Sequence, residues 1–139
     1  MNPSFEERSV WVTLIATLLV LGGYFYVAAG LLAEGITEMA AYVPLFVVAV
    51  GLLVVVLIVG HLLAIIGGKP EDRDERDRQI AWRAEHNSSW LLAVGVLAAV
   101  FGLALPIEKV WIANGLLAAL FVSEVMSKLL QLVYYRRGM

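Results

Sequence analysis

Residues 42–66 read YVPLFVVAVGLLVVVLIVGHLLAII, a stretch in which His61 is the one strongly polar side chain. A run of about 20 apolar residues crosses the hydrocarbon core of a bilayer as an α-helix, because each residue adds about 1.5 Å. Three further runs of this kind occur, at residues 10–29, 89–105 and 110–135. None of them alternates polar and apolar residues as membrane β-barrel strands do. The sequence therefore predicts an all-α integral membrane protein with four transmembrane helices.

The composition agrees with this prediction and excludes several classes of function. The chain has 139 residues, of which 61% are hydrophobic, and a formal net charge of -2, so it lacks the basic surplus typical of nucleic-acid binding. It contains no cysteine, which excludes disulfides, thiol catalysis and thiolate metal sites. We expect one membrane domain over residues 1–139, with the lipid bilayer as its main partner and no nucleic-acid partner.

The distribution of Lys and Arg predicts the orientation. Cytoplasmic segments of membrane proteins carry an excess of these residues. If the helices alternate in direction, nearly all basic residues outside the spans fall on one side, while the other side has Lys109. Both termini and the loop at residues 67–88 are therefore predicted to be cytoplasmic, in an inner (plasma) membrane. The residues on the cytoplasmic side are Arg8, Lys69, Arg73, Arg76, Arg78, Arg83, Arg136 and Arg137.

The connections predict how the helices pair. Pro106 ends the third span, and only a few residues separate it from the fourth, so these spans form an antiparallel hairpin. The first and second spans form a looser hairpin through GLLAEGITEMAAY, residues 30–42. We expect a four-transmembrane-helix bundle made of these two hairpins.

The loop at residues 67–88 concentrates much of the charge of the chain. Opposite charges four residues apart share one helix face and favour a short helix; the pairs are Asp72–Arg76, Asp74–Arg78 and Arg73–Asp77. This helix could continue into the third span. Two interpretations stay open: a solvated, self-neutralised connector, or an interaction surface for a protein partner or a second copy. The candidate surface comprises Asp74, Glu75, Arg76, Asp77, Arg78 and Trp82.

Three short motifs carry a resemblance to a known family. FEER (residues 5–8) precedes the first span, DERDRQI (residues 74–80) follows the second, and WIAN (residues 111–114) opens the fourth. With these motifs the chain resembles a family of small bacterial four-span membrane proteins of unknown function, which share a D-E-R-D-x-x-I motif after the second span. The resemblance implies the same topology and supplies no catalytic residue.

Polar residues within the predicted spans form the second candidate site. Ionisable side chains inside a bilayer are costly and often functional. The predicted cluster contains His61, Asn114, Glu124, Lys128 and Gln131, with His61 and Lys128 at similar depth in the cytoplasmic half. In one interpretation Glu124 and Lys128, four residues apart, neutralise each other and His61 bonds a backbone carbonyl. In the other, the cluster of His61, Glu124 and Lys128 handles protons or cations.

No enzyme motif is present. The chain has no HExxH, phosphate-binding glycine loop or G-x-S-x-G. His86 precedes the third span, which argues against haem ligation together with His61. We therefore expect no catalytic residue, no metal and no cofactor. Small residues four apart, as in Gly95/Ala99 and Gly115/Ala119, favour close packing of the third and fourth spans or a homodimer.

Together these observations predict a non-enzymatic inner-membrane protein that acts through protein–protein or regulatory interaction by its charged cytoplasmic loop. The alternative is a small dimeric transporter or channel for protons or cations that uses the intramembrane Glu/Lys/His cluster.

Overall fold

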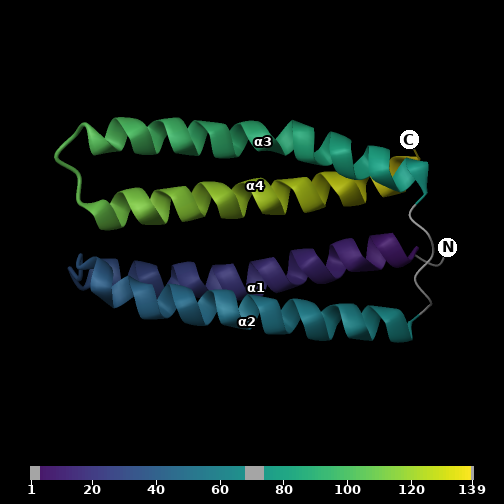
Figure 1. Cartoon of the computed structure of the whole chain (residues 1–139), viewed down its shortest axis with the longest axis horizontal. Helices are drawn as coiled ribbons and strands as arrows, with labels where there is room; N and C mark the ends of the chain where they lie inside the picture. The colour runs from purple at the N-terminus through teal and green to yellow at the C-terminus, as the bar shows by residue number, and fades with distance from the viewer. Residues whose placement is uncertain (1–3, 68–73, 139) are drawn as a thin grey trace.

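The computed structural model describes residues 4–67 and 74–138, and four long helices account for most of this part of the chain. They are α1 (Phe5–Ala33), α2 (Met39–Ile66), α3 (Glu75–Leu103) and α4 (Lys109–Arg137). The helices run side by side with alternating direction, and both chain ends lie at the same end of the molecule (Figure 1). All four are long and apolar enough to cross a membrane. The prediction of four helices compatible with a four-span bundle is confirmed.

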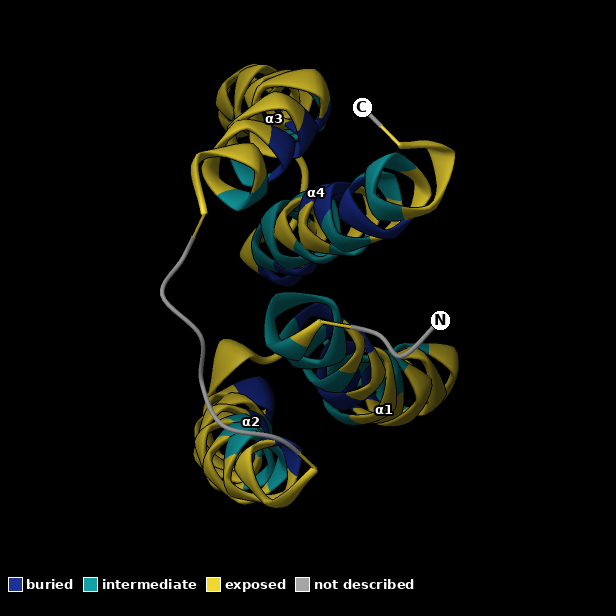
Figure 2. Ribbon diagram, turned by 90° about the vertical axis from the view of Figure 1, so that its right-hand side faces the viewer, coloured by how far each residue is buried: buried dark blue, intermediate teal, exposed yellow. Residues whose placement is uncertain are grey.

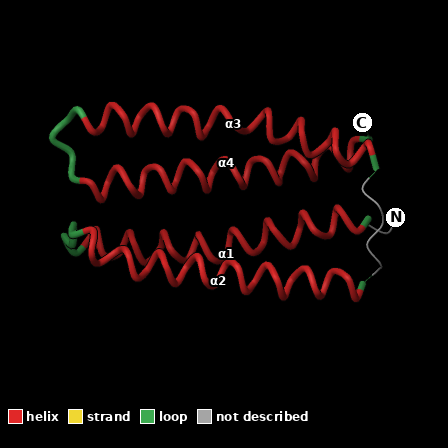
Figure 3. The backbone as a smooth tube through the Cα atoms, in the orientation of Figure 1, coloured by secondary structure: helices red, strands yellow, loops and turns green. Residues whose placement is uncertain are grey.

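Local capping interactions define where the helices begin and end. Ser4 caps α1, because its hydroxyl accepts a hydrogen bond from the backbone N–H of Glu7 at 3.2 Å. Gly35, with φ of 77°, follows the end of α1, and its N–H donates to the carbonyl of Leu32. The N–H of Ile36 donates to the carbonyl of Leu31, which completes a Schellman motif. Short loops join α1 to α2 and α3 to α4 (Figure 3).

The helices form a staggered row rather than a closed square. Viewed along the helices, the order is α2, α1, α4, α3, with α2 and α3 at the two ends of the row (Figure 2). The most extensive packing joins α3 to α4, then α1 to α2, and the two hairpins meet mainly where α1 packs against α4. The predicted pairing into two antiparallel hairpins is thus correct, and the α1–α4 contact is the seam between them.

Two small apolar clusters hold this row together. The first, near the α1–α2 turn, contains Tyr24, Ala28, Tyr42, Ala49 and Val110. The second lies at the opposite end and contains Val10, Leu14 and Leu132. Arg8 reinforces that end, because its Nη1 donates to the carbonyl of Gly67 at 2.7 Å and so ties the start of α1 to the end of α2.

Most large aliphatic side chains point away from these clusters. Val54, Val55, Leu62 and Leu63 on α2 are each more than half exposed. A soluble monomer rarely leaves so much contiguous apolar surface to water, whereas lipid tails accommodate it. The surface therefore supports the assignment of the chain as a multi-pass membrane protein.

The predicted loop at residues 67–88 is largely helical. Helix α3 begins at Glu75 rather than near Ser89, because Asp74 forms a capping box with Asp77 at its first turn. The charged segment thus continues without interruption into the third span. Residues 68–73 lie outside the described residues, and so do the predicted pairs that involve Asp72 and Arg73.

Candidate functional site

The predicted polar residues of α4 lie at two different interfaces. Asn114 lies at the contact with α1, where its Oδ1 accepts a hydrogen bond from Tyr24 Oη at 2.9 Å. Its Nδ2 donates to the carbonyl of Val110, also at 2.9 Å. Because both polar ends of the amide are bonded, Asn114 is a structural link across the seam. Glu124, Lys128 and Gln131 lie further along α4, beside α3.

These three residues line a polar groove between α3 and α4, which we call the α3–α4 groove. Its volume is about 320 Å³. The buried lining is formed by Ser88, Ser123, Ser127 and Gln131, and Glu85, Ser89 and Glu124 are exposed at its opening. The lining residues are Ala81, Glu85, Ser88, Ser89, Leu92, Leu120, Ser123, Glu124, Ser127, Lys128 and Gln131.

Part of the groove is held by internal hydrogen bonds. Ser123 Oγ donates to the carbonyl of Ser88 at 3.2 Å, and so joins α4 to α3. Ser88 Oγ donates to the carbonyl of Glu85 at 3.1 Å, within α3. Both serine hydroxyls thus form hydrogen bonds within the protein. The hydrogen bond from Ser123 to Ser88 fixes the spacing of the two helices along the groove.

Other polar groups of the groove have no bonding partner. In residues 4–67 and 74–138, no hydrogen bond or ion pair involves Glu124, Ser127, Lys128 or Gln131. The predicted ion pair between Glu124 and Lys128 is therefore not formed. A helical spacing of four makes these side chains neighbours, but it does not bring their charged ends together. Both charges line the groove instead.

His61 is not part of this groove. Its Nδ1 lies 2.7 Å from the carbonyl of Leu57, and its Nε2 lies 2.9 Å from the hydroxyl of Ser9 on α1. A carbonyl only accepts, so Nδ1 carries the proton and the Ser9 hydroxyl donates to Nε2. The expectation that His61 bonds a backbone carbonyl is confirmed. The cluster of His61 with Glu124 and Lys128 is not assembled, because α1 lies between α2 and α4 (Figure 2).

The groove lies well below the end of α4. Glu124 precedes Tyr134 by ten residues, or roughly 15 Å along the helix. Lys128 precedes it by six residues, or roughly 9 Å. On α3 the groove runs from Ala81, beside Trp82, to Leu92, so it extends from the charged first turns of this helix to the start of its apolar run at residue 89.

The predicted interaction residues divide into structural and exposed groups. Asp74 and Asp77 form the capping box of α3, and Asp77 Oδ1 also accepts a hydrogen bond from Tyr135 Oη on α4 at 3.0 Å. Asp74 is thus occupied as a cap rather than paired with Arg78. Glu75, Arg76, Arg78 and Trp82 are exposed.

Trp82 is the most prominent of the exposed residues. Its side chain is 67% exposed. The indole stacks on the ring of His86, with centroids 5.6 Å apart and an angle of 16° between the planes. It borders a shallow surface hollow shared with Glu75, Arg78 and Gln79. A rigid aromatic side chain among charges of both signs is a typical anchor for a protein partner.

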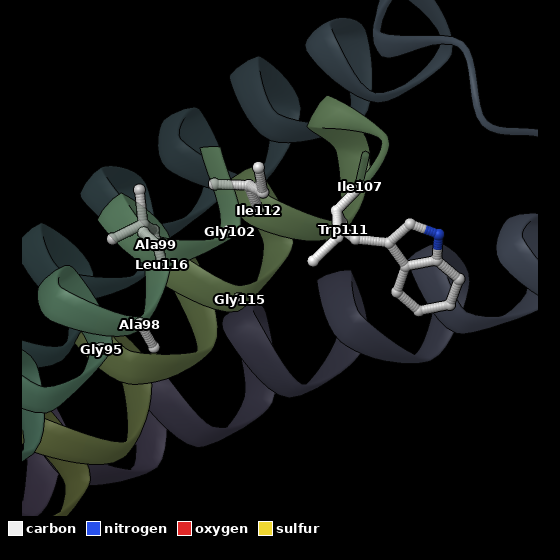
Figure 4. A pocket seen from close by; sticks show the side chains of 9 residues that line it. All are labelled: Gly95, Ala98, Ala99, Gly102, Ile107, Trp111, Ile112, Gly115 and Leu116. Carbon is white, nitrogen blue, oxygen red and sulfur yellow. The ribbon is translucent and has the colours of Figure 1, made fainter. Parts of the chain in front are cut away.

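Small residues bring α3 and α4 together in the other half of the hairpin. A Cβ added at Gly95 would overlap the Cβ of Ala119, and one added at Gly102 would lie 3.3 Å from Ile112 Cγ1. The predicted small-residue packing within one chain is therefore correct. Beside these contacts lies an apolar cavity of about 240 Å³ lined by residues of both helices, with Trp111 at its edge (Figure 4).

The sequence analysis named Gln131 but missed the buried groove residues Ser123 and Ser127. Ser123, Ser127 and Gln131 step by four and therefore share one face of α4. This regular spacing of small polar residues is the signal that could have identified the buried side of the groove. Nothing in the sequence indicated that Glu85 and Ser88 of α3 would face it. Among the described residues, no group of three His, Asp or Glu side chains is placed to hold a metal ion.

Comparison of the chain with models of protein families, with curated proteins and with solved structures finds no match. The resemblance based on FEER, DERDRQI and WIAN stays a prediction. The functional assignment accordingly depends on the residues of this chain alone.

Proposed function

We propose that this chain is a non-enzymatic, multi-pass inner-membrane protein that acts by binding another protein through the exposed face of the first turns of α3. We call this face, formed by Glu75, Arg76, Arg78 and Trp82, the α3 docking face. The observation that carries the proposal is the exposed Trp82, held on a continuous helix and surrounded by charges. A helix fixes these side chains relative to one another, so less conformational entropy is lost on binding.

The packing of α3 supports a rigid presentation of this face. Ile80 and Ala84 are almost fully buried on the side of α3 opposite to the docking face, and Asp77 is bonded to Tyr135 of α4. The first turns of α3 are thereby packed against the bundle on one side, and the α3 docking face on the other side stays exposed. A flexible connector would lack such anchoring contacts.

The placement of basic residues supports a cytoplasmic location for the α3 docking face. The start of α1, with Arg8, the start of α3, with Arg76 and Arg78, and the end of α4, with Arg136, lie at one end of the molecule (Figure 1). Lys109 begins α4 at the other end. Following the bias of basic residues toward the cytoplasm, we place both termini and this face on the cytoplasmic side.

The transporter alternative receives less support. It required His61 and Glu124 to act together, and His61 is bonded to Ser9 and Leu57 instead. A continuous relay of proton-carrying groups through one chain would need a further partner between them. The separation of these residues therefore favours interaction over transport.

A photo-crosslinking experiment tests the proposal. A photoreactive amino acid at position 79, beside Trp82, should give a discrete crosslinked product in intact cells. The double variant Arg76→Glu/Arg78→Glu should abolish the product, because it reverses the charge of the docking face. Lys109→Glu, at the opposite end of the molecule, is the matched control and should retain it. A product that is unchanged in the double variant would contradict the proposal.

A further inference from the structure

The α3–α4 groove has features of a binding site that the proposed function does not use. Ser127 and Gln131 are each only 6% exposed, they line the groove, and neither has a hydrogen-bond partner among the described residues. Among described side chains that are not exposed, Arg8 Nε is the one fully buried polar atom without a hydrogen bond, so the Ser127 hydroxyl and the Gln131 amide keep access to the groove and can bond what fills it. A hydroxyl and an amide that face an unfilled groove therefore indicate a ligand with both donors and acceptors.

The charges of the groove define the ligand further. Glu85 and Glu124 contribute carboxylates at the opening, and Lys128 contributes an ammonium. None of these three charges has an ion-pair partner in the described part of the chain. Charges at this depth are stabilised when a counter-charge is bound beside them. The groove is thus complementary to a molecule with one cationic and one anionic group.

The position of the groove identifies the kind of molecule. On α3 it runs from Ala81, beside Trp82, to Leu92, and so spans the point at residue 89 where the apolar run of this helix starts. A membrane helix at that level is surrounded by phospholipids, whose headgroups lie within several Å of the hydrocarbon boundary. We propose that the α3–α4 groove binds the headgroup of a zwitterionic phospholipid with a primary ammonium, that is, a phosphoethanolamine headgroup.

Hydrogen-bond chemistry accounts for the primary ammonium. Such an ammonium has three N–H donors, which can serve the carboxylates of Glu85 and Glu124 together with one neutral oxygen. The phosphate accepts from Lys128, from the Ser127 hydroxyl and from the Gln131 amide. A quaternary choline group keeps the charge but has no N–H donor. A glycerol headgroup has no cation and leaves the two carboxylates unpaired.

A methylation series separates hydrogen bonding from charge. The protein, purified in detergent and freed of lipid, is titrated by native mass spectrometry with dioleoyl phosphatidylethanolamine, its N-methyl and N,N-dimethyl derivatives, phosphatidylcholine and phosphatidylglycerol. We expect affinity for the first bound lipid to fall with each N–H removed. The total loss from ethanolamine to choline should be roughly tenfold or more. Equal affinity for all five lipids would overturn the proposal.

Matched variants locate the site. Glu124→Gln should abolish the preference for phosphatidylethanolamine, because it removes a carboxylate that accepts from the ammonium. Lys128→Met should weaken binding of all five lipids, because Lys128 donates to the phosphate that they share. Glu108→Gln and Lys109→Met remove the same charges at the other end of α4 and should keep both the preference and the affinity. If Glu124→Gln does not fold, Glu85→Gln replaces it, and if Lys128→Met does not fold, Gln131→Leu replaces it, with the same expected results. A preference that survives removal of the groove carboxylate overturns the proposal, as does unchanged lipid affinity after removal of the Lys128 ammonium, or a lipid-free dimer whose formation the groove variants prevent.

Discussion

Asn114 illustrates how one side chain can fix two helices. Its carbonyl oxygen accepts from Tyr24 of α1, and its amide donates back to Val110 of α4. In a bilayer no water replaces a lost bond of this kind, and measured interhelical hydrogen bonds contribute about 0.6 kcal/mol on average. The sequence marked Asn114 as a polar residue within a span, but its partner on another helix followed only from the packing.

Removal of the Tyr24 hydroxyl should weaken the seam between the hairpins. We expect Tyr24→Phe to lower the free energy of unfolding in detergent by about 1 kcal/mol, because Asn114 Oδ1 then stays buried without a donor. The control is Tyr26→Phe, since Tyr26 is 84% exposed on the same helix. It should leave stability unchanged within about 0.5 kcal/mol. Equal effects of the two substitutions would show that the bond contributes nothing.

Among the helices, the α3–α4 pair depends most directly on one small residue. Gly95 lies against Ala119 with no room for a Cβ. Gly95→Ala should force the helices apart and lower the melting temperature, with a cost of about 1–3 kcal/mol from overpacking. Gly115→Ala, where a Cβ meets nothing within 4 Å, should be tolerated. The double variant Gly95→Ala/Ala119→Gly should recover part of the loss; no recovery would mean that another contact is responsible.

The helices themselves were predictable, and their ends were less so. The lengths of the apolar runs alone indicated all four helices, since few other structures satisfy the backbone hydrogen bonds inside a bilayer. Helix α1 begins at Phe5 and α3 at Glu75, well before the apolar runs at residues 10 and 89. Hydropathy detects where lipid contact starts, whereas a cap such as Asp74 sets where the helix starts.

For the whole molecule, the order in which the four helices pack side by side could not be predicted from the sequence. Between lipid-facing helices there is no hydrophobic drive, so the packing of small residues and single hydrogen bonds decides the neighbours. The similar positions of His61 and Glu124 along their helices made a contact between them possible from the sequence alone. The packing of α1 between α2 and α4 separates them, and that placement depends on contacts such as Tyr24–Asn114 that join residues far apart in the chain.

Crosslinking can test this order, because the chain contains no natural cysteine. The ring centroids of Phe25 on α1 and Phe121 on α4 lie 5.6 Å apart, so the two side chains meet, and the double variant Phe25→Cys/Phe121→Cys should be joined within one chain by a short bismaleimide. The control pair His61→Cys/Glu124→Cys should not. Efficient intramolecular crosslinking of the control pair, measured by mass spectrometry of the monomer, would indicate a closed bundle instead of a row.

The apolar stretches of the two outermost helices differ in length. Residues 42–66 of α2 extend over roughly 37 Å, and residues 89–105 of α3 over roughly 25 Å, at 1.5 Å per residue. Because α2 and α3 occupy opposite ends of the row, a flat bilayer cannot match both. Lipids must stretch beside one flank and compress beside the other, at a fraction of a kcal/mol per Å. This difference in hydrophobic mismatch tilts the protein relative to the bilayer normal and favours its location in curved or thinned regions of the membrane.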